Sequence, residues 1–174
     1  MSKYILHNSH GFTLIELLLY LALSTLMVVV LGGIGVHVLS ARSKVQAEAE
    51  LNYNIQFSIE KMRMLIEEST AITSPDLHAT SSTLSFTSAA ASQNPVTIDL
   101  FNDQIRLQEG DAQPVFLTSN AVDITKLQFT NATEDASAGL IQIVMNSESH
   151  NPAKSTDRQA SSSVTIAVAS LLSP

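Results

Sequence analysis

The chain has 174 residues, a formal net charge of −7 and a pI near 5.0, which fits one domain with an appendage. Its nine Lys and Arg residues are scattered and Trp is absent, so neither a phosphate-binding surface for nucleic acid nor an aromatic platform for bases is expected. The absence of Cys excludes disulfides, thiolate chemistry and Cys-based zinc sites.

The first predicted element is a long apolar helix close to the N-terminus. Between Phe12 and Leu39 the only formally charged residue is Glu16. These 28 positions (39 − 12 + 1) would form a helix of about 42 Å, against roughly 30 Å of bilayer hydrocarbon. We therefore expect residues 12–39 to form a transmembrane helix.

A short polar segment, residues 1–11, precedes this helix. A secretory signal peptide carries its small-residue cleavage site after the apolar core, whereas Gly11 lies before it. Cleavage after Gly11 would therefore leave the helix on the mature protein. Lys3 lies on one side of the helix and Arg42 and Lys44 on the other, so the distribution of positive charge does not decide the orientation.

Glu16 is the unusual residue of the apolar segment. A carboxylate at the centre of a membrane helix costs about 2.5–3.5 kcal/mol, and less near an end. One interpretation is that Glu16 lies at the interface or is protonated. The other is that it meets a cation, namely the new α-amine of Phe12 on a neighbouring copy shifted by about 6 Å, the axial rise of four residues. A wrongly staggered copy would leave both groups unpaired.

The stretch "GFTLIELL" resembles the N-terminal signature of type IV pilins and type II secretion pseudopilins. The resemblance implies that prepilin peptidase cleaves after Gly11 and N-methylates Phe12 on the cytoplasmic face. It also implies that Glu16, the fifth mature residue, associates with the N-terminus of an adjacent subunit during assembly. The resemblance also implies a single-pass protein of the bacterial inner membrane, with its C-terminal globular domain outside the cytoplasm.

One feature departs from that family pattern. Many members carry a helix-breaking proline after the glutamate, whereas this helix has Gly32, Gly33 and Gly35 instead. Each glycine costs a helix about 1 kcal/mol relative to Ala. The cluster predicts either a place where the helix bends or stretches, or close packing of helices through small residues.

Residues 40–70 are predicted to continue the helix in amphipathic form. Ile55, Ile59, Met62 and Ile66 follow the helical i, i+4, i+7, i+11 spacing, and most charged residues lie off that stripe. This stripe is what a helix needs to pack on a sheet. The helix should end before Pro75.

Residues 71–174 change to an alternating pattern that predicts short strands. A hairpin is expected around Asn102 and Asp103, and residues 147–162 read as a polar loop. The predicted fold class is α+β, with an antiparallel β-sheet domain packed on the long helix in a pilin-like fold. The strand order is similar to that of J-type minor pseudopilins. The strand candidates are 83–86, 96–100, 105–107, 114–118, 124–130, 139–146 and 162–170.

No constellation for catalysis or metal binding is expected. The sequence has none of the common metalloprotease, serine-hydrolase or phosphate-loop motifs, and the five His residues are dispersed. Asn131 begins a three-residue glycosylation sequon, a pattern that often occurs by chance. An acidic group near the hairpin has oxygen ligands suited to calcium but no standard loop spacing. That group comprises Asp99, Asp103, Glu109 and Asp111, and the His residues are His7, His10, His37, His78 and His150.

The function expected from these observations is that of a structural subunit without cofactor or catalytic site. By resemblance it would be a minor subunit of a type IV pilus or pseudopilus, since it lacks the C-terminal Cys pair of many major pilins. Its partners would be other pilin-like subunits, prepilin peptidase, the inner-membrane assembly platform and membrane lipid. The alternatives are an envelope enzyme or binding protein with an uncleaved anchor, and a pilin-like subunit for adhesion or DNA uptake.

Overall fold

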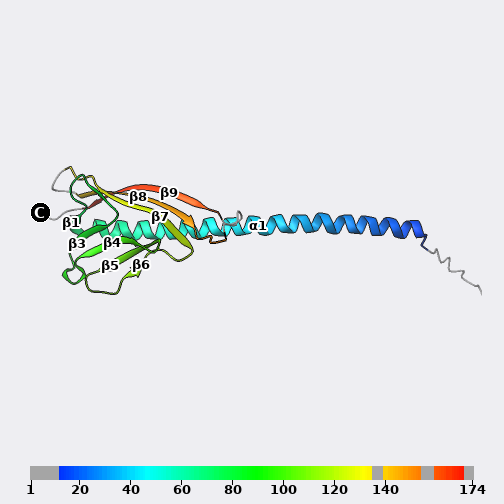
Figure 1. The fold of residues 1–174 in the computed structure, drawn as a ribbon, viewed down its shortest axis with the longest axis horizontal. Helices are drawn as coiled ribbons and strands as arrows, with labels where there is room; N and C mark the ends of the chain where they lie inside the picture. The colour runs from blue at the N-terminus through cyan, green and yellow to red at the C-terminus, as the bar shows by residue number, and fades with distance from the viewer. Residues whose placement is uncertain (1–11, 135–138, 154–158, 171–174) are drawn as a thin grey trace, which may run out of the picture. The chain divides into compact units, whose positions relative to one another are not determined.

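Figure 1 shows the fold in a computed structural model that describes residues 12–134, 139–153 and 159–170. The predicted leader, including Gly11, lies outside the described residues. The chain divides into two units, residues 1–42 and 43–174. Helix α1 (Leu14–Glu67) supplies nearly all the described residues of the first unit and contributes its C-terminal half to the second.

The second unit adds antiparallel strands to this helix, which confirms the predicted α+β class (Figure 1). The strands form two sheets, in the orders β1-β3-β4-β5-β6 and β2-β7-β8-β9, where a single sheet was the simplest expectation. A short 3-10 helix, η1 (Ala91–Gln93), precedes β4. The strands are β1 (Ser69–Ser74), β2 (Thr80–Ser81), β3 (Leu84–Ser88), β4 (Val96–Phe101), β5 (Gln104–Glu109), β6 (Val115–Phe116), β7 (Val122–Asn131), β8 (Gly139–Ser149) and β9 (Ser161–Ser170).

The predicted apolar stripe of the helix lies in the core. Ile55, Met62 and Ile66 are at most 4% exposed, and Ile59 packs against them while partly buried. The inward-facing residues of the strands belong to the same buried cluster, so the helix and both sheets share one apolar core. These residues include Leu84, Phe86, Val96, Ile98, Ile105, Leu107, Ile124, Leu127, Phe129, Ile141, Ile143 and Met145.

Strand β7 keeps its apolar residues inward by means of a β-bulge. Ile124 and Leu127 are both buried, although three positions separate them and strict alternation would place them on opposite faces. The register of β7 against β8 shifts between Ile124 and Lys126. The extra residue restores the inward orientation, so that Phe129 is also completely buried.

The predicted turn at Asn102 and Asp103 joins β4 and β5. Both residues have positive φ, 50° and 59°, as a two-residue hairpin of the primed type requires. The pairing then runs without interruption from Phe101–Gln104 to Val96–Glu109. The turn residues therefore fix the register that places Ile98 and Leu107 in the core.

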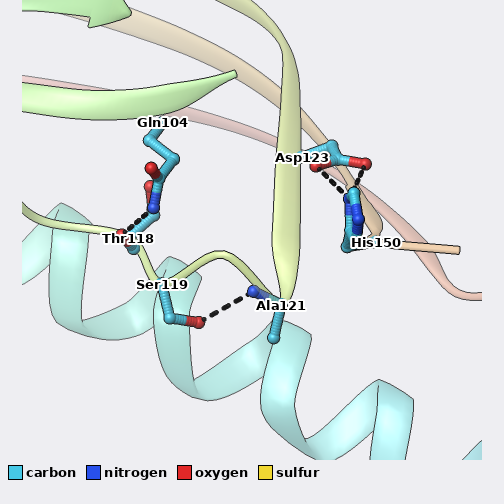
Figure 2. Close-up of polar contacts among 6 residues, drawn as sticks. All are labelled: Gln104, Thr118, Ser119, Ala121, Asp123 and His150. Carbon is cyan, nitrogen blue, oxygen red and sulfur yellow. Dashed lines mark hydrogen bonds and ion pairs between the residues drawn. The ribbon is translucent and has the colours of Figure 1, made fainter. Parts of the chain in front are cut away.

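Segment 117–119 is tied to α1 by hydrogen bonds from two buried polar side chains of the helix. Ser58 donates to the Leu117 carbonyl at 3.2 Å, and Asn54 Oδ1 accepts from Ser119 N at 2.8 Å. Next to this contact, Gln104 donates to the Thr118 carbonyl at 2.9 Å (Figure 2). These bonds satisfy polar groups that would otherwise be costly to bury between the helix and the sheet.

Gly110 should not tolerate a side chain. Its φ is +54°, and an added Cβ would lie 3.0 Å from the Ser92 carbonyl oxygen. We expect Gly110→Ala to lower the free energy of unfolding by about 1–3 kcal/mol, measured by thermal unfolding of the sheet signal in circular dichroism. The control is Gly32→Ala, because nothing lies within 4 Å of a Cβ added there. Equal unfolding temperatures for the Gly110 variant and the wild type would contradict this account.

Candidate functional site

The first turn of α1 contains two of the residues singled out in the sequence. The helix begins at Leu14, so Thr13 occupies the N-cap position and Glu16 the third helical position. The Glu16 backbone N–H donates to Thr13 Oγ1 at 3.3 Å. Thr-x-x-Glu is the spacing of a capping box, and a carboxylate in the first turn also interacts favourably with the helix dipole. Sequence reasoning missed this local role, although the Thr13–Glu16 spacing could have revealed it.

Phe12 and Glu16 both lie on the surface of the first unit. Phe12 is 75% exposed, and its ring meets the edge of Tyr20 with 6.2 Å between centroids. Among the described residues, no Lys, Arg or His lies within ion-pair distance of Glu16. The described part of the chain therefore supplies no counter-charge to this carboxylate.

The helix between Leu14 and Leu39 presents an uncovered apolar surface. The large apolar side chains described here are 48–78% exposed. Its most apolar 18-residue window has a mean hydropathy of 2.5 and no share buried within the protein. The hydroxyls of Ser24 and Thr25 donate to the Leu21 carbonyl at 2.9 and 2.7 Å, so they bring no unsatisfied donor into an apolar medium. By length and composition this one helix can cross a membrane.

The same region is matched by a known family. Residues 6–32 fit the model described as the prokaryotic N-terminal methylation motif, and Gly11, Phe12 and Glu16 lie within the match. The match covers the N-terminal segment and supports the resemblance to the type IV pilin and pseudopilin family. The long N-terminal helix followed by antiparallel sheets is a pilin-like arrangement, in agreement with that assignment. No curated protein and no solved structure matches the chain significantly.

The matched motif and the apolar helix support several statements at a coarse level. The motif supports processing by prepilin peptidase and assembly with other pilin subunits. The apolar helix fits anchoring in the inner membrane. A structural subunit is favoured over an enzyme. The individual roles of Gly11, Phe12 and Glu16 remain predictions.

The acidic residues near the hairpin are not gathered into a metal centre. No group of three or more His, Asp or Glu residues in the described part of the chain could hold a metal ion. Asp99 instead accepts two hydrogen bonds from Arg106, one of them 2.9 Å from Nε. This hydrogen bond raises the pKa of Arg106, whose guanidinium also lies 4.6 Å from the centroid of the Phe101 ring. Asp103 and Glu109 lie at opposite ends of the β4–β5 hairpin.

The sequon at Asn131 is part of the folded core. Asn131 is only 5% exposed. Its amide donates to the Pro75 carbonyl at 3.0 Å, and its side-chain oxygen accepts from Thr133 N at 3.2 Å. The residue therefore closes the connection around Pro75, and its amide is not presented on the surface for modification.

Of the His residues, His150 alone has a carboxylate partner among the described residues. Its Nδ1 lies 2.9 Å from each carboxylate oxygen of Asp123 (Figure 2). Its backbone N–H also donates to the Ala121 carbonyl at 2.8 Å. These contacts hold the end of β8 against the start of β7. They border two open hollows of about 200 and 590 Å³, one against Glu50 of α1 and the other against Glu148.

Proposed function

We propose that the chain is a structural minor subunit of a type IV pilus or type II secretion pseudopilus. The observation that carries the proposal is the coincidence of the methylation motif with a helix whose apolar side chains the protein leaves uncovered. Uncovered apolar surface of this extent is stable in lipid or against other apolar helices, and costly in water. A subunit that is stored in the membrane and then moves into the helical core of a filament would keep this surface in an apolar environment at both stages.

The processing step assigns a role to each end of the Gly11–Phe12 bond. Prepilin peptidase would cleave this bond on the cytoplasmic face and N-methylate the new amine of Phe12. Two supports are the position of the bond within the matched motif and the start of α1 two residues later, at Leu14. The methylated amine keeps its positive charge, so it can still act as a counter-ion.

Glu16 would then set the stagger between neighbouring subunits. Four residues of helix rise by about 6 Å, so a copy displaced by roughly that distance would bring the amine of its Phe12 alongside the Glu16 carboxylate. The pair neutralises two groups that lipid solvates poorly, whereas a wrongly placed copy leaves both charges without a partner. The lack of an ion-pair partner for Glu16 among the described residues supports this role.

The remaining assignments follow from the same resemblance. The unit of residues 43–174 would lie outside the cytoplasm, and the filament would extend into the periplasm or from the cell surface. An inner-membrane assembly platform would move each subunit out of the bilayer. A minor role, of the J type by strand order, is supported by the absence of Cys.

Mass spectrometry of the mature protein tests this proposal. We expect protein purified from a host with prepilin peptidase to lack residues 1–11 and to carry one methyl group on Phe12. The matched control is the same chain from a host without the peptidase, which should retain the leader and the unmethylated N-terminus. Filaments that contain the chain with Met1–Gly11 intact would overturn the proposal and favour an envelope protein with an uncleaved anchor.

A further inference from the structure

The described strands leave four sheet edges, and one of them differs from the others. The edges are β1 and β6 in one sheet, and β2 and β9 in the other. Strands β2 and β6 are two residues long, and the pairing of β1 is interrupted by two register shifts. Short or irregular strands are poor templates for a further strand. Strand β9 has ten residues, and its pairing with β8 runs in unbroken register from Ser161–Glu148 to Ser170–Gly139.

The exposed edge of β9 also lacks the usual protection. Natural edge strands discourage pairing with other chains by means of lysines, prolines or bulges. The sequence of β9, SSSVTIAVAS, contains no charged residue, proline or glycine. Among the described residues β9 pairs only with β8, so alternate N–H and C=O groups along it face away from the sheet. Its C-terminal end is not part of this open edge, because Ser170 is buried and its hydroxyl donates to the Ser69 carbonyl of β1 at 3.0 Å. Figure 1 shows β9 as the red strand at the rim of its sheet, beside β8.

The side chains of β9 indicate what would fit beside it. One row consists of small exposed residues, among them Thr165 and Ala167. In the other row Val168 is 3% exposed, whereas Val164 and Ile166 are only partly buried against the core. A strand added at this edge would bury more of Val164 and Ile166 if it carried apolar side chains at alternate positions. A charged strand would lose solvation and find no counter-charge on β9.

We infer that the free edge of β9 binds an extended, uncharged segment of another protein chain with apolar side chains at alternate positions. The parts of the second unit outside the described residues span 135–138, 154–158 and 171–174, each too short to pair with ten residues. Pairing of β9 with β9 of a second copy would be a two-fold contact that closes after two molecules. A filament grows by head-to-tail contacts, which a closed pair of β9 strands would not provide. The choice of a strand other than β9 of a second copy therefore rests on the proposed function. Main-chain hydrogen bonds would supply the affinity.

Peptide binding to the full-length chain in detergent micelles tests this inference. The probe is a fluorescein-labelled peptide of five Val-Thr repeats between two lysines, followed by fluorescence anisotropy. The edge variant is Ala167→Lys and the matched control is Gln142→Lys, because the two residues are exposed register partners on β9 and β8. We expect saturable binding to the wild type and to the control, and binding at least about tenfold weaker to the edge variant.

Disulfide formation at a Cys introduced on β9 distinguishes two occupants of the edge, an added peptide strand and a second copy of the chain. The natural chain has no Cys, so Thr165→Cys introduces a single thiol on the exposed row of β9. A Val-Thr peptide with one central Cys in place of Thr should form a disulfide with this variant and not with Gln142→Cys on the interior strand. Facing side chains on adjacent strands lie about 4.5–5.5 Å apart at Cβ, close enough for such a bond after small adjustments.

Three outcomes would overturn the inference. They are no saturable binding of the peptide, equal binding to the Ala167→Lys variant, and a disulfide-linked homodimer of Thr165→Cys formed in preference to the peptide adduct. The last would assign the edge to a second copy. None of these measurements depends on removal of the leader or on filament growth, so their failure is distinguishable from failure of the proposed function. Circular dichroism of each variant confirms that the sheets are retained.

Discussion

Replacement of Glu16 by Ala is expected to reduce incorporation of the chain into filaments by at least about tenfold, with membrane insertion unchanged. The neighbouring amine would lose its counter-charge in lipid, and an unpaired buried charge costs several kcal/mol. A tenfold change in an equilibrium corresponds to about 1.4 kcal/mol, so tenfold is a conservative expectation. The measurement compares the variant in sheared filaments with the variant in the membrane fraction, by quantitative immunoblotting.

Two further variants separate pairing from helix capping. Glu16→Gln preserves the capping-box side chain but removes the charge, and Thr13→Ala removes the hydroxyl that accepts from Glu16 N. If the charge matters, Gln should be nearly as defective as Ala. Loss of the cap alone costs about 0.5–2 kcal/mol of helix stability and should affect incorporation less. Normal incorporation of Glu16→Gln would reject the pairing role of Glu16.

The elements of the fold were predictable where their own residues determine them. The stripe through Ile55, Met62 and Ile66 indicated the packed face of α1, and alternation indicated the strands around Ile98 and Ile143. Strand β1 was missed because Ser69–Ser74 is short, follows the helix directly and has Ile72 as its one large apolar residue. The division into two sheets was also missed, because the choice of pairing partner depends on residues far apart in the chain.

The candidate functional features also differ in whether neighbouring residues in the sequence are enough to predict them. Glu16 was singled out because it is the one formal charge in a membrane helix, whereas the roles of Gly11 and Phe12 were predicted from the resemblance to pilins and stay predictions. The capping role of Thr13 is equally local, because it follows from the Thr-x-x-Glu spacing at the start of the helix. The free edge of β9 could not have been predicted, since its alternating sequence is the same whether a strand has one neighbour or two. Only the arrangement of all the strands distinguishes an edge from an interior position.

Replacement of Phe129 by Ala is expected to cost about 3–5 kcal/mol of stability in the second unit. Phe129 is completely buried, and β7 holds it between Ser81 of β2 and Ile143 of β8. Removal of the ring leaves a cavity that strands paired on both sides cannot readily close. Domains are stable by only about 5–15 kcal/mol, so this loss is a large fraction of the total. Thermal unfolding of the sheet signal should occur roughly 10–20 °C lower.

The matched control for this change is Phe101→Ala, which removes the same group from the surface. Phe101 is 44% exposed and contacts Arg106 and Phe116 near the hairpin turn. Its replacement forfeits a cation–π contact and part of a ring–ring contact, together worth about 1–2 kcal/mol at an exposed site, and creates no cavity. Because Phe129 lies far along the chain from the assembly helix, its variant should still insert into the membrane and lose its leader. Similar unfolding temperatures for the two variants would mean that the core around β7 relaxes to fill the space, contrary to the packing described for this unit.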